Sequence, residues 1–223
     1  MSALCPLLPL DAGLRMTPML LAFSVGICSY NRKKTDAKQG LAERNAVVFN
    51  RAHSHTYGPS IAKVRITEFF DPACKTCRAF YPMVKRLVDA GQGRMQLVVR
   101  FFSCHDGSGL AAKILVATDA QKLLLPVTSR VLSSQESWAS HINPKPELIW
   151  SLLRGTGLDI PRAQAYVSSA NVQAVIDQNL MDAKTLQVTK TPGLFVNGKL
   201  LENFGYDQLK TLVQQALQLA HPQ

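Results

Sequence analysis

Two cysteines separated by two residues, Cys74-Lys75-Thr76-Cys77, form the pair in this sequence best suited to redox chemistry. Thiols at this spacing support reversible disulfide exchange or the binding of a soft metal ion such as Cu(I). A structural zinc site needs two more ligands, usually from a second paired motif, and the sequence has no second motif of this kind. Disulfide exchange is therefore the preferred interpretation, and a soft-metal protein that uses the same cysteines is the alternative.

The elements predicted around this motif assign different roles to its two cysteines. Residues 63–70, KVRITEFF, are rich in β-branched and aromatic side chains and predict a buried strand, and an amphipathic helix is expected from Cys77 to Asp89. Cys74 then lies near the amino end of that helix, where free amide groups and the helix dipole stabilise a thiolate, and Lys75 adds a positive charge. Cys77, one turn further along, is expected to be more buried and to release the partner by attacking the mixed disulfide.

Two other residues with chemical potential lie close to this motif. Glu68 interrupts an otherwise apolar strand, so we expect its carboxyl group beneath the motif, where it accepts or relays a proton from Cys77. The alternative is a glutamate at a strand edge that faces water. Cys104, followed by His105, ends the next predicted strand and is expected to be either a half-buried inert thiol, which we favour, or a thiol within reach of Cys74.

The remaining elements show how the chain positions these residues. A second strand is predicted over residues 95–102, which gives a strand–helix–strand unit with a parallel pair of strands. A helical region follows, too long to be a loop, and we interpret it as an inserted subdomain. The chain then closes with two strands around the hairpin signal Asn197-Gly198 and a final amphipathic helix. Specific expectations in these regions are one helix over Leu110–Leu124, strands over Gly193–Asn197 and Lys199–Phe204, and a helix over Tyr206–Leu219.

The amino-terminal region reads as a targeting segment followed by a linker. Met16–Cys28 is a mostly apolar stretch, short for a membrane span but of the right size for the apolar core of a signal peptide. We favour an export signal or a single anchor, and an ordinary helix is the alternative. The predicted segments are a signal peptide or membrane anchor (1–28), a polar linker (29–57), the first half of the fold (58–107), the helical subdomain (108–186) and the second half of the fold (187–223).

Composition narrows the classes of function. The net charge is +10, but the basic residues are scattered, and the one run, Arg32-Lys33-Lys34, has no interleaved aromatic residues, which argues against nucleic-acid binding. Of five cysteines, two lie in the amino-terminal segment. The remaining three are too few for a disulfide scaffold, so cysteine here is expected to do chemistry.

Taken together, EFFDPACKTC and VTKTPGLFVNGK resemble the DsbA/DsbG-like branch of the thioredoxin-fold thiol–disulfide oxidoreductases, over residues 58–219. The resemblance implies an α/β thioredoxin fold with a helical subdomain inserted between the second and third strands. Glu68 matches the buried acid of that family, Cys74 the exposed nucleophile and Cys77 the resolving cysteine. Pro192 matches the proline that follows a cis peptide bond and packs against the two cysteines.

The same resemblance implies partners and a location. The cis turn exposes the backbone of Thr191 for pairing with an extended substrate peptide, and Lys75 and Thr76 are expected to contact the substrate too. The partners would be unfolded or thiol-containing proteins and a redox partner protein, in the periplasm or cell envelope, with anchoring to the inner membrane as an option. No cofactor and no metal are expected. The Lys-Thr dipeptide differs from the Pro-His of strongly oxidising members, which leaves the direction of electron flow open.

Overall fold

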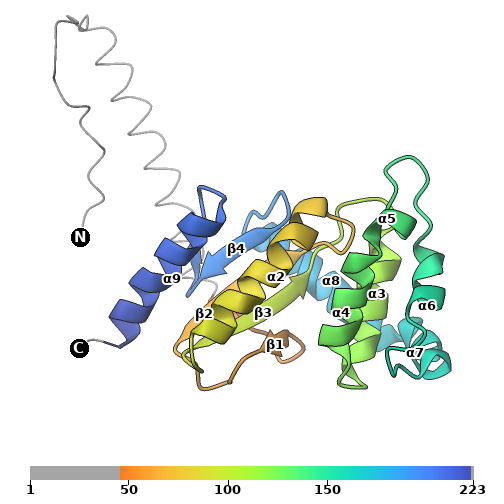
Figure 1. The fold of residues 1–223 in the computed structure, drawn as a ribbon, viewed down its shortest axis with the longest axis horizontal. Helices are drawn as coiled ribbons and strands as arrows, with labels where there is room; N and C mark the ends of the chain where they lie inside the picture. The colour runs from red at the N-terminus through yellow and green to blue at the C-terminus, as the bar shows by residue number, and fades with distance from the viewer. Residues whose placement is uncertain (1–45, 222–223) are drawn as a thin grey trace, which may run out of the picture.

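A sheet of five strands runs through the part of the chain that the computed structural model describes, residues 46–221 (Figure 1). The strands lie in the order β1-β3-β2-β4-β5. β2 and β3 are parallel and are joined by helix α2, whereas every other pair is antiparallel. The bounds are β1 His55–Tyr57, β2 Val64–Phe70, α2 Lys75–Ala90, β3 Met95–Phe101, β4 Gly193–Val196 and β5 Lys199–Leu200.

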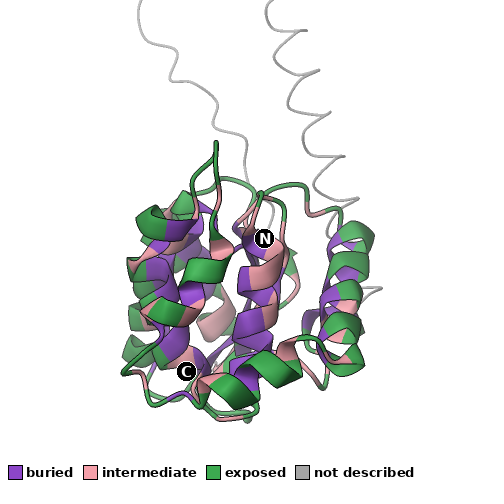
Figure 2. Ribbon diagram, turned by 90° about the vertical axis from the view of Figure 1, so that its right-hand side faces the viewer, coloured by how far each residue is buried: buried purple, intermediate pink, exposed green. Residues whose placement is uncertain are grey.

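Side chains alternate between the two faces of the sheet, and each face has its own helical cover. Ile66 of β2 packs against α2 and the closing helix α9 (Tyr206–Ala220), which lie side by side on one face (Figure 1). Phe69 points the other way, towards the end of helix α8 (Ala170–Thr185). Figure 2 shows the result, with buried residues on the inner sides of the helices and exposed residues on the outer sides.

The helices between β3 and β4 form a block beside the sheet, at the right of Figure 1. Their common core extends to Cys74 and Cys77 without interruption, so the block covers the carboxyl ends of the parallel strands. The structure thus has the thioredoxin fold with an inserted helical subdomain that the sequence predicts. Besides α8, the block contains α3 Ser108–Asp119, α4 Leu124–Ser133, α5 Gln135–Trp138, η2 Pro146–Leu148, α6 Ile149–Leu152 and α7 Ile160–Val167.

Two local predictions differ from the structure. The single helix expected over Leu110–Leu124 ends at Asp119, because the chain turns through a positive φ of 58° at Lys122 before α4 begins. The returning strand expected over Lys199–Phe204 ends at Leu200, and after one more backbone hydrogen bond, from the Leu201 N–H to the Leu194 carbonyl, the chain enters the loop before α9.

The amino-terminal segment also differs from its prediction. Within the linker predicted over 29–57, the 3-10 helix η1 (Ala46–Phe49) and strand β1 form part of the fold, because Phe49 is buried and His55 pairs with Val99 of β3. The predicted signal or anchor (1–28) and the rest of the linker lie outside the described residues. Over residues 46–221, no helix combines the length and the hydropathy that a membrane span requires.

A buried ionic network joins this amino-terminal segment to the sheet and to α8. Arg100 of β3 is fully buried, forms an ion pair with Asp182 of α8, and donates hydrogen bonds to the Asn179 side chain at 2.8 Å and to the Val48 carbonyl. Arg51 adds a second pair with Asp182 through Nη2 at 2.7 Å. Buried charges are costly unless they are paired. Each charged group of this network therefore needs its partners to offset the free-energy cost of its burial.

We expect Asp182→Ala to lower the free energy of unfolding by about 3–5 kcal/mol, because it leaves the buried Arg100 without its counter-charge. Chemical denaturation followed by circular dichroism measures the change. The control is Glu136→Ala, which removes the partially exposed Arg78–Glu136 pair and should cost less than about 1 kcal/mol. Equal losses in the two variants would show that the network contributes no more than a surface ion pair.

A candidate dithiol active site

Cys74 occupies the N-cap position of α2, so its sulfur faces the free amide groups of the first helical turn. The Cys77 backbone N–H donates to the Cys74 sulfur at 3.4 Å, and the Cys74 thiol donates to the Thr191 carbonyl oxygen, also at 3.4 Å. The expected exposed nucleophile is in fact 5% exposed. Cys74 is covered because the helical subdomain packs over the first turn of α2.

The surroundings of Cys74 favour the thiolate. Its pKa is lowered to about 5, first by the hydrogen bond from the Cys77 thiol, then by that from the Thr191 side-chain hydroxyl and by the backbone N–H groups of Cys77 and Thr76, while burial opposes them. Lys75 is exposed and is not among these groups. Hydrogen bonds at the helix end therefore stabilise the thiolate, rather than the lysine charge invoked from the sequence.

Cys77 is in the opposite state. It is fully buried, and burial raises the pKa of its thiol far above the ordinary value, with further increases from its hydrogen bond to Cys74 and from the negative charge of Glu68. Cys77 is therefore a neutral thiol at physiological pH. One reactive and one protected sulfur lie within a single turn of helix.

Glu68 lies on the same face of β2 as Ile66, the face that α2 covers. It is fully buried, and neither carboxylate oxygen has a hydrogen-bond partner among residues 46–221. Its pKa is raised to about 8, first by burial and then by the negative charge of Cys74. The alternative of a water-facing glutamate at a strand edge is wrong, because β2 is flanked on both sides, with Glu68 opposite Val99 and Leu194.

The Thr191-Pro192 peptide bond has the cis conformation implied by the resemblance. Thr191 meets Cys74 across 117 residues of sequence, whereas Lys75 and Thr76 are exposed beside them. Pro192 also lines a groove of about 500 Å³ between the loop before β4 and the loop after β5. The lining of this groove includes neither cysteine and none of Thr191, Lys75 and Thr76.

Sequence reasoning missed Gln135, which holds the active-site loop from the helical subdomain. This buried side chain on α5 donates from Nε2 to the Pro72 carbonyl at 2.8 Å and to the Cys74 carbonyl at 3.1 Å. It lies in the polar run Ser133–Ser137. Nothing in that run distinguishes Gln135 from its solvent-facing neighbours.

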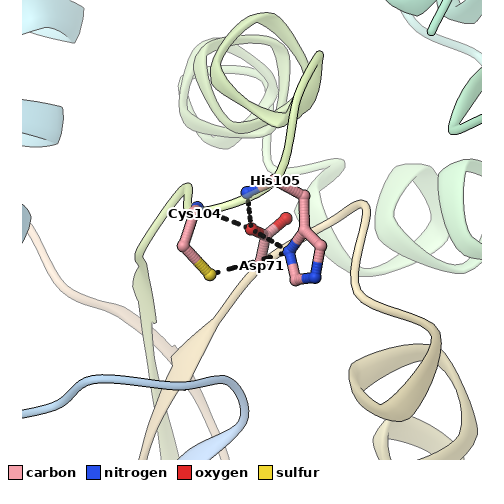
Figure 3. A group of neighbouring side chains, drawn as sticks. All are labelled: Asp71, Cys104 and His105. Atoms are coloured by element: carbon pink, nitrogen blue, oxygen red, sulfur yellow. Dashed lines mark hydrogen bonds and ion pairs between the residues drawn. The ribbon is translucent and has the colours of Figure 1, made fainter. Parts of the chain in front are cut away.

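Cys104 also differs from the favoured prediction, because it is exposed rather than half-buried. Its sulfur lies 3.6 Å from the Thr191 hydroxyl oxygen and 3.6 Å from His105 Nδ1. The fully buried Asp71 lies beneath both residues and accepts hydrogen bonds from their backbone N–H groups (Figure 3).

Comparison with known proteins agrees with this geometry. A family model described as thioredoxin matches residues 50–215, which include both cysteines, Glu68 and the cis proline. The chain belongs to this thioredoxin family. It is also 24% identical over 167 residues to a candidate protein-disulfide oxidoreductase of Rickettsia conorii, covering 72% of this chain and 59% of that protein. The chain thus spans about three fifths of the length of this curated relative.

Solved structures share the fold. A thioredoxin-like oxidoreductase from Silicibacter pomeroyi superposes with a TM-score of 0.67 at 26% identity, over 77% of this chain and 96% of that chain. The thiol-disulfide exchange protein α-DsbA2 from Wolbachia pipientis superposes with a TM-score of 0.68 at 16% identity, over 82% and 97%. These likenesses confirm the resemblance to thioredoxin-fold oxidoreductases drawn from the two motifs.

We expect Glu68→Gln to stabilise the protein in a pH-dependent way. A carboxyl whose pKa rises from 4.5 in the unfolded chain to about 8 in the folded protein binds more protons when folded, so its contribution to stability falls as pH rises through this window. Replacing it should therefore raise the free energy of unfolding at pH 7 by on the order of 3 kcal/mol relative to pH 4.5.

Urea denaturation of both proteins at pH 4.5, 7 and 8 measures this difference. Thr67→Val, a change at the neighbouring buried position on the opposite face of β2, is the control and should shift stability equally at all three values. A Glu68→Gln effect that is also independent of pH would show that the carboxyl group does not titrate in the folded protein.

Proposed function

We propose that this protein catalyses thiol–disulfide exchange with protein substrates. The observation that carries the proposal is the pairing of a low-pKa sulfur at a helix N-cap with a buried neutral thiol one turn away. The thiolate is the nucleophile of disulfide exchange, so Cys74 attacks and Cys77 resolves. Thr191, Lys75 and Thr76 border the point of attack and form the substrate contacts of this proposal.

The exchange runs in two balanced steps. In the reducing direction the Cys74 thiolate attacks one sulfur of a substrate disulfide, and the other substrate sulfur leaves as a thiolate. Cys77 then loses its proton and attacks the Cys74 sulfur, which forms the Cys74–Cys77 disulfide and releases the second substrate thiol. The oxidising direction is the reverse of these steps.

Glu68 is suited to receive the Cys77 proton at the second step. Burial raises the pKa of Glu68 most, and while Cys74 is a thiolate its negative charge raises that pKa further, so the carboxyl group holds its proton. Once Cys74 is joined to the substrate, that charge is gone and Glu68 ionises more readily. The same event thus supplies the base when Cys77 has to lose its proton.

The direction of electron flow follows from thiolate stability. A more stable thiolate makes the reduced form more stable and the protein more oxidising. The pKa of about 5 for Cys74 lies between about 3.5 for a strong oxidant of this fold and about 7 for thioredoxin. We therefore place the protein between the two, as an oxidant or isomerase of intermediate strength.

The proposed setting is the periplasm or cell envelope. The apolar stretch 16–28 supports export or anchoring, and the disulfides of protein substrates form and persist mainly in oxidising compartments such as the periplasm. Thiol-containing proteins would be the substrates, and a redox partner protein would recharge the dithiol. In the alternative of a soft-metal protein, purified material would carry stoichiometric Cu(I) that Cys74→Ser removes.

We expect Cys74→Ser to abolish insulin reduction and Cys77→Ser to accumulate mixed disulfides with substrate proteins, because only the resolving step is blocked. Non-reducing electrophoresis of the variants with a reduced and an oxidised substrate protein measures this. The doubly substituted Cys74→Ser/Cys77→Ser protein is the control, and any dithiothreitol-sensitive bands that it gives come from Cys104, Cys5 or Cys28 and are subtracted. Normal turnover by Cys74→Ser would refute the assignment of the nucleophile.

We expect a reduction potential near the middle of the range from roughly −120 mV to about −270 mV, at about −190 mV. Equilibration with glutathione buffers measures it, and the thiolate absorbance of Cys74 should titrate with a midpoint near 5. Cys77→Ala should raise that midpoint, because it removes the strongest hydrogen-bond donor to the sulfur. A potential as low as that of thioredoxin would make the protein a reductase.

A further inference from the structure

Three side chains with metal-binding atoms meet beside the dithiol without belonging to it. Asp71 directly follows β2, and Cys104 and His105 follow β3, whose carboxyl end lies beside that of β2 because the two strands are parallel and in register to Phe70 and Phe101. Their donor atoms all lie within 4.8 Å of one another. Figure 3 shows the His105 ring directed towards the Asp71 carboxylate, and the Cys104 sulfur beside the ring nitrogen of His105.

We propose that Asp71, Cys104 and His105 form a binding site for a divalent ion of the zinc class. Thiolate sulfur, imidazole nitrogen and carboxylate oxygen are the three kinds of ligand that zinc takes. A tetrahedral ion with bonds of about 2.3 Å to sulfur and about 2.1 Å to nitrogen holds these two atoms about 3.6 Å apart. The Cys104 sulfur and His105 Nδ1 are 3.6 Å apart in the structure.

The carboxylate is held in place for this role. Asp71 Oδ1 accepts the Ala73 N–H at 2.8 Å, and Oδ2 accepts the backbone N–H groups of Cys104 at 2.7 Å and His105 at 3.0 Å. His105 Nδ1 lies 2.8 Å from the same oxygen, so an ion entering between them replaces a ring hydrogen bond. The Cys104 thiol proton leaves to solvent, and the ring proton moves to Nε2.

Space for the ion and for a fourth ligand lies next to these atoms. A cavity of about 210 Å³ is lined by Cys104, His105 and, on its other side, His141. The centroids of the two imidazole rings are 6.3 Å apart. Three protein ligands with one position open to water are the arrangement found in catalytic rather than structural zinc sites.

The donor set distinguishes this site from the dithiol. Soft ions such as Cu(I) prefer thiolates, whereas a carboxylate ligand favours a harder divalent ion. Cys74 and Cys77 are not ligands here, so the site and the exchange reaction are separable. A variant that no longer binds the metal ion can therefore still be assayed for disulfide exchange, and a variant without exchange activity can still be assayed for metal binding.

The test uses the full chain with the other four cysteines, Cys5, Cys28, Cys74 and Cys77, replaced by serine, so that Cys104 is the sole thiol. Titration with Co²⁺ should give one-to-one binding with thiolate-to-cobalt charge-transfer absorption, and Zn²⁺ should displace the cobalt. Cys104→Ser should abolish the charge-transfer band, and His105→Gln should weaken binding more than about 100-fold, since loss of an outer-shell partner alone costs about 10- to 100-fold. His221→Gln, at the carboxyl end of α9, is the matched control and should bind normally.

A second measurement does not need the other cysteines to be replaced. In the unaltered protein, Zn²⁺ should slow alkylation of Cys104 by iodoacetamide at least tenfold, as measured on the Cys104 peptide by mass spectrometry. Cobalt binding without a charge-transfer band, normal affinity in His105→Gln, or alkylation of Cys104 at an unchanged rate would each overturn the proposal.

Discussion

The hydrogen bonding of the Cys74 sulfur at the start of α2 is the interaction on which the rest of the site depends. Cys74 is buried as a residue, and the loss of hydration on burial would by itself raise the pKa of its thiol. The Cys77 thiol and the free amide groups of the first helical turn reverse that effect. The thiolate is thus stable because the protein replaces water with fixed donors.

The neighbouring acids stay neutral beneath this thiolate. Burial is the main reason that the pKa values of both Cys77 and Glu68 are raised, and the negative charge of Cys74 raises them further. The three groups share one excess charge in a buried volume between β2 and α2. Moving a proton or forming a disulfide at one of them changes the charge state that the others prefer.

The helical subdomain makes this burial possible. Its core is continuous with Cys74 and Cys77, and Gln135 binds two carbonyl groups of the loop that precedes α2. Without this cover the amino end of α2 would face water, as a helix end in an open position does. The subdomain therefore shapes the electrostatics of the dithiol as well as the surface around it.

The order of the elements and the identity of the dithiol follow from local sequence patterns. A CxxC between an apolar strand and an amphipathic helix places its first cysteine at a helix end, because strand and helix are local patterns of side chains. An acidic residue in the apolar strand Val64–Phe70 was for the same reason a candidate for burial. Local patterns also gave the closing elements β4 and α9 nearly as observed.

Which distant residues meet these local features depends on the packing of the whole fold. Thr191 reaches Cys74, Gln135 reaches the loop before α2, and Asp71 reaches Cys104 and His105, across 33 to 117 residues of chain. The burial of Arg100 with Asp182 and the pairing of β1 with β3 are of the same kind. The periodicity of a segment reports which face is apolar, but not which segment covers that face, because that choice depends on how all the elements pack together.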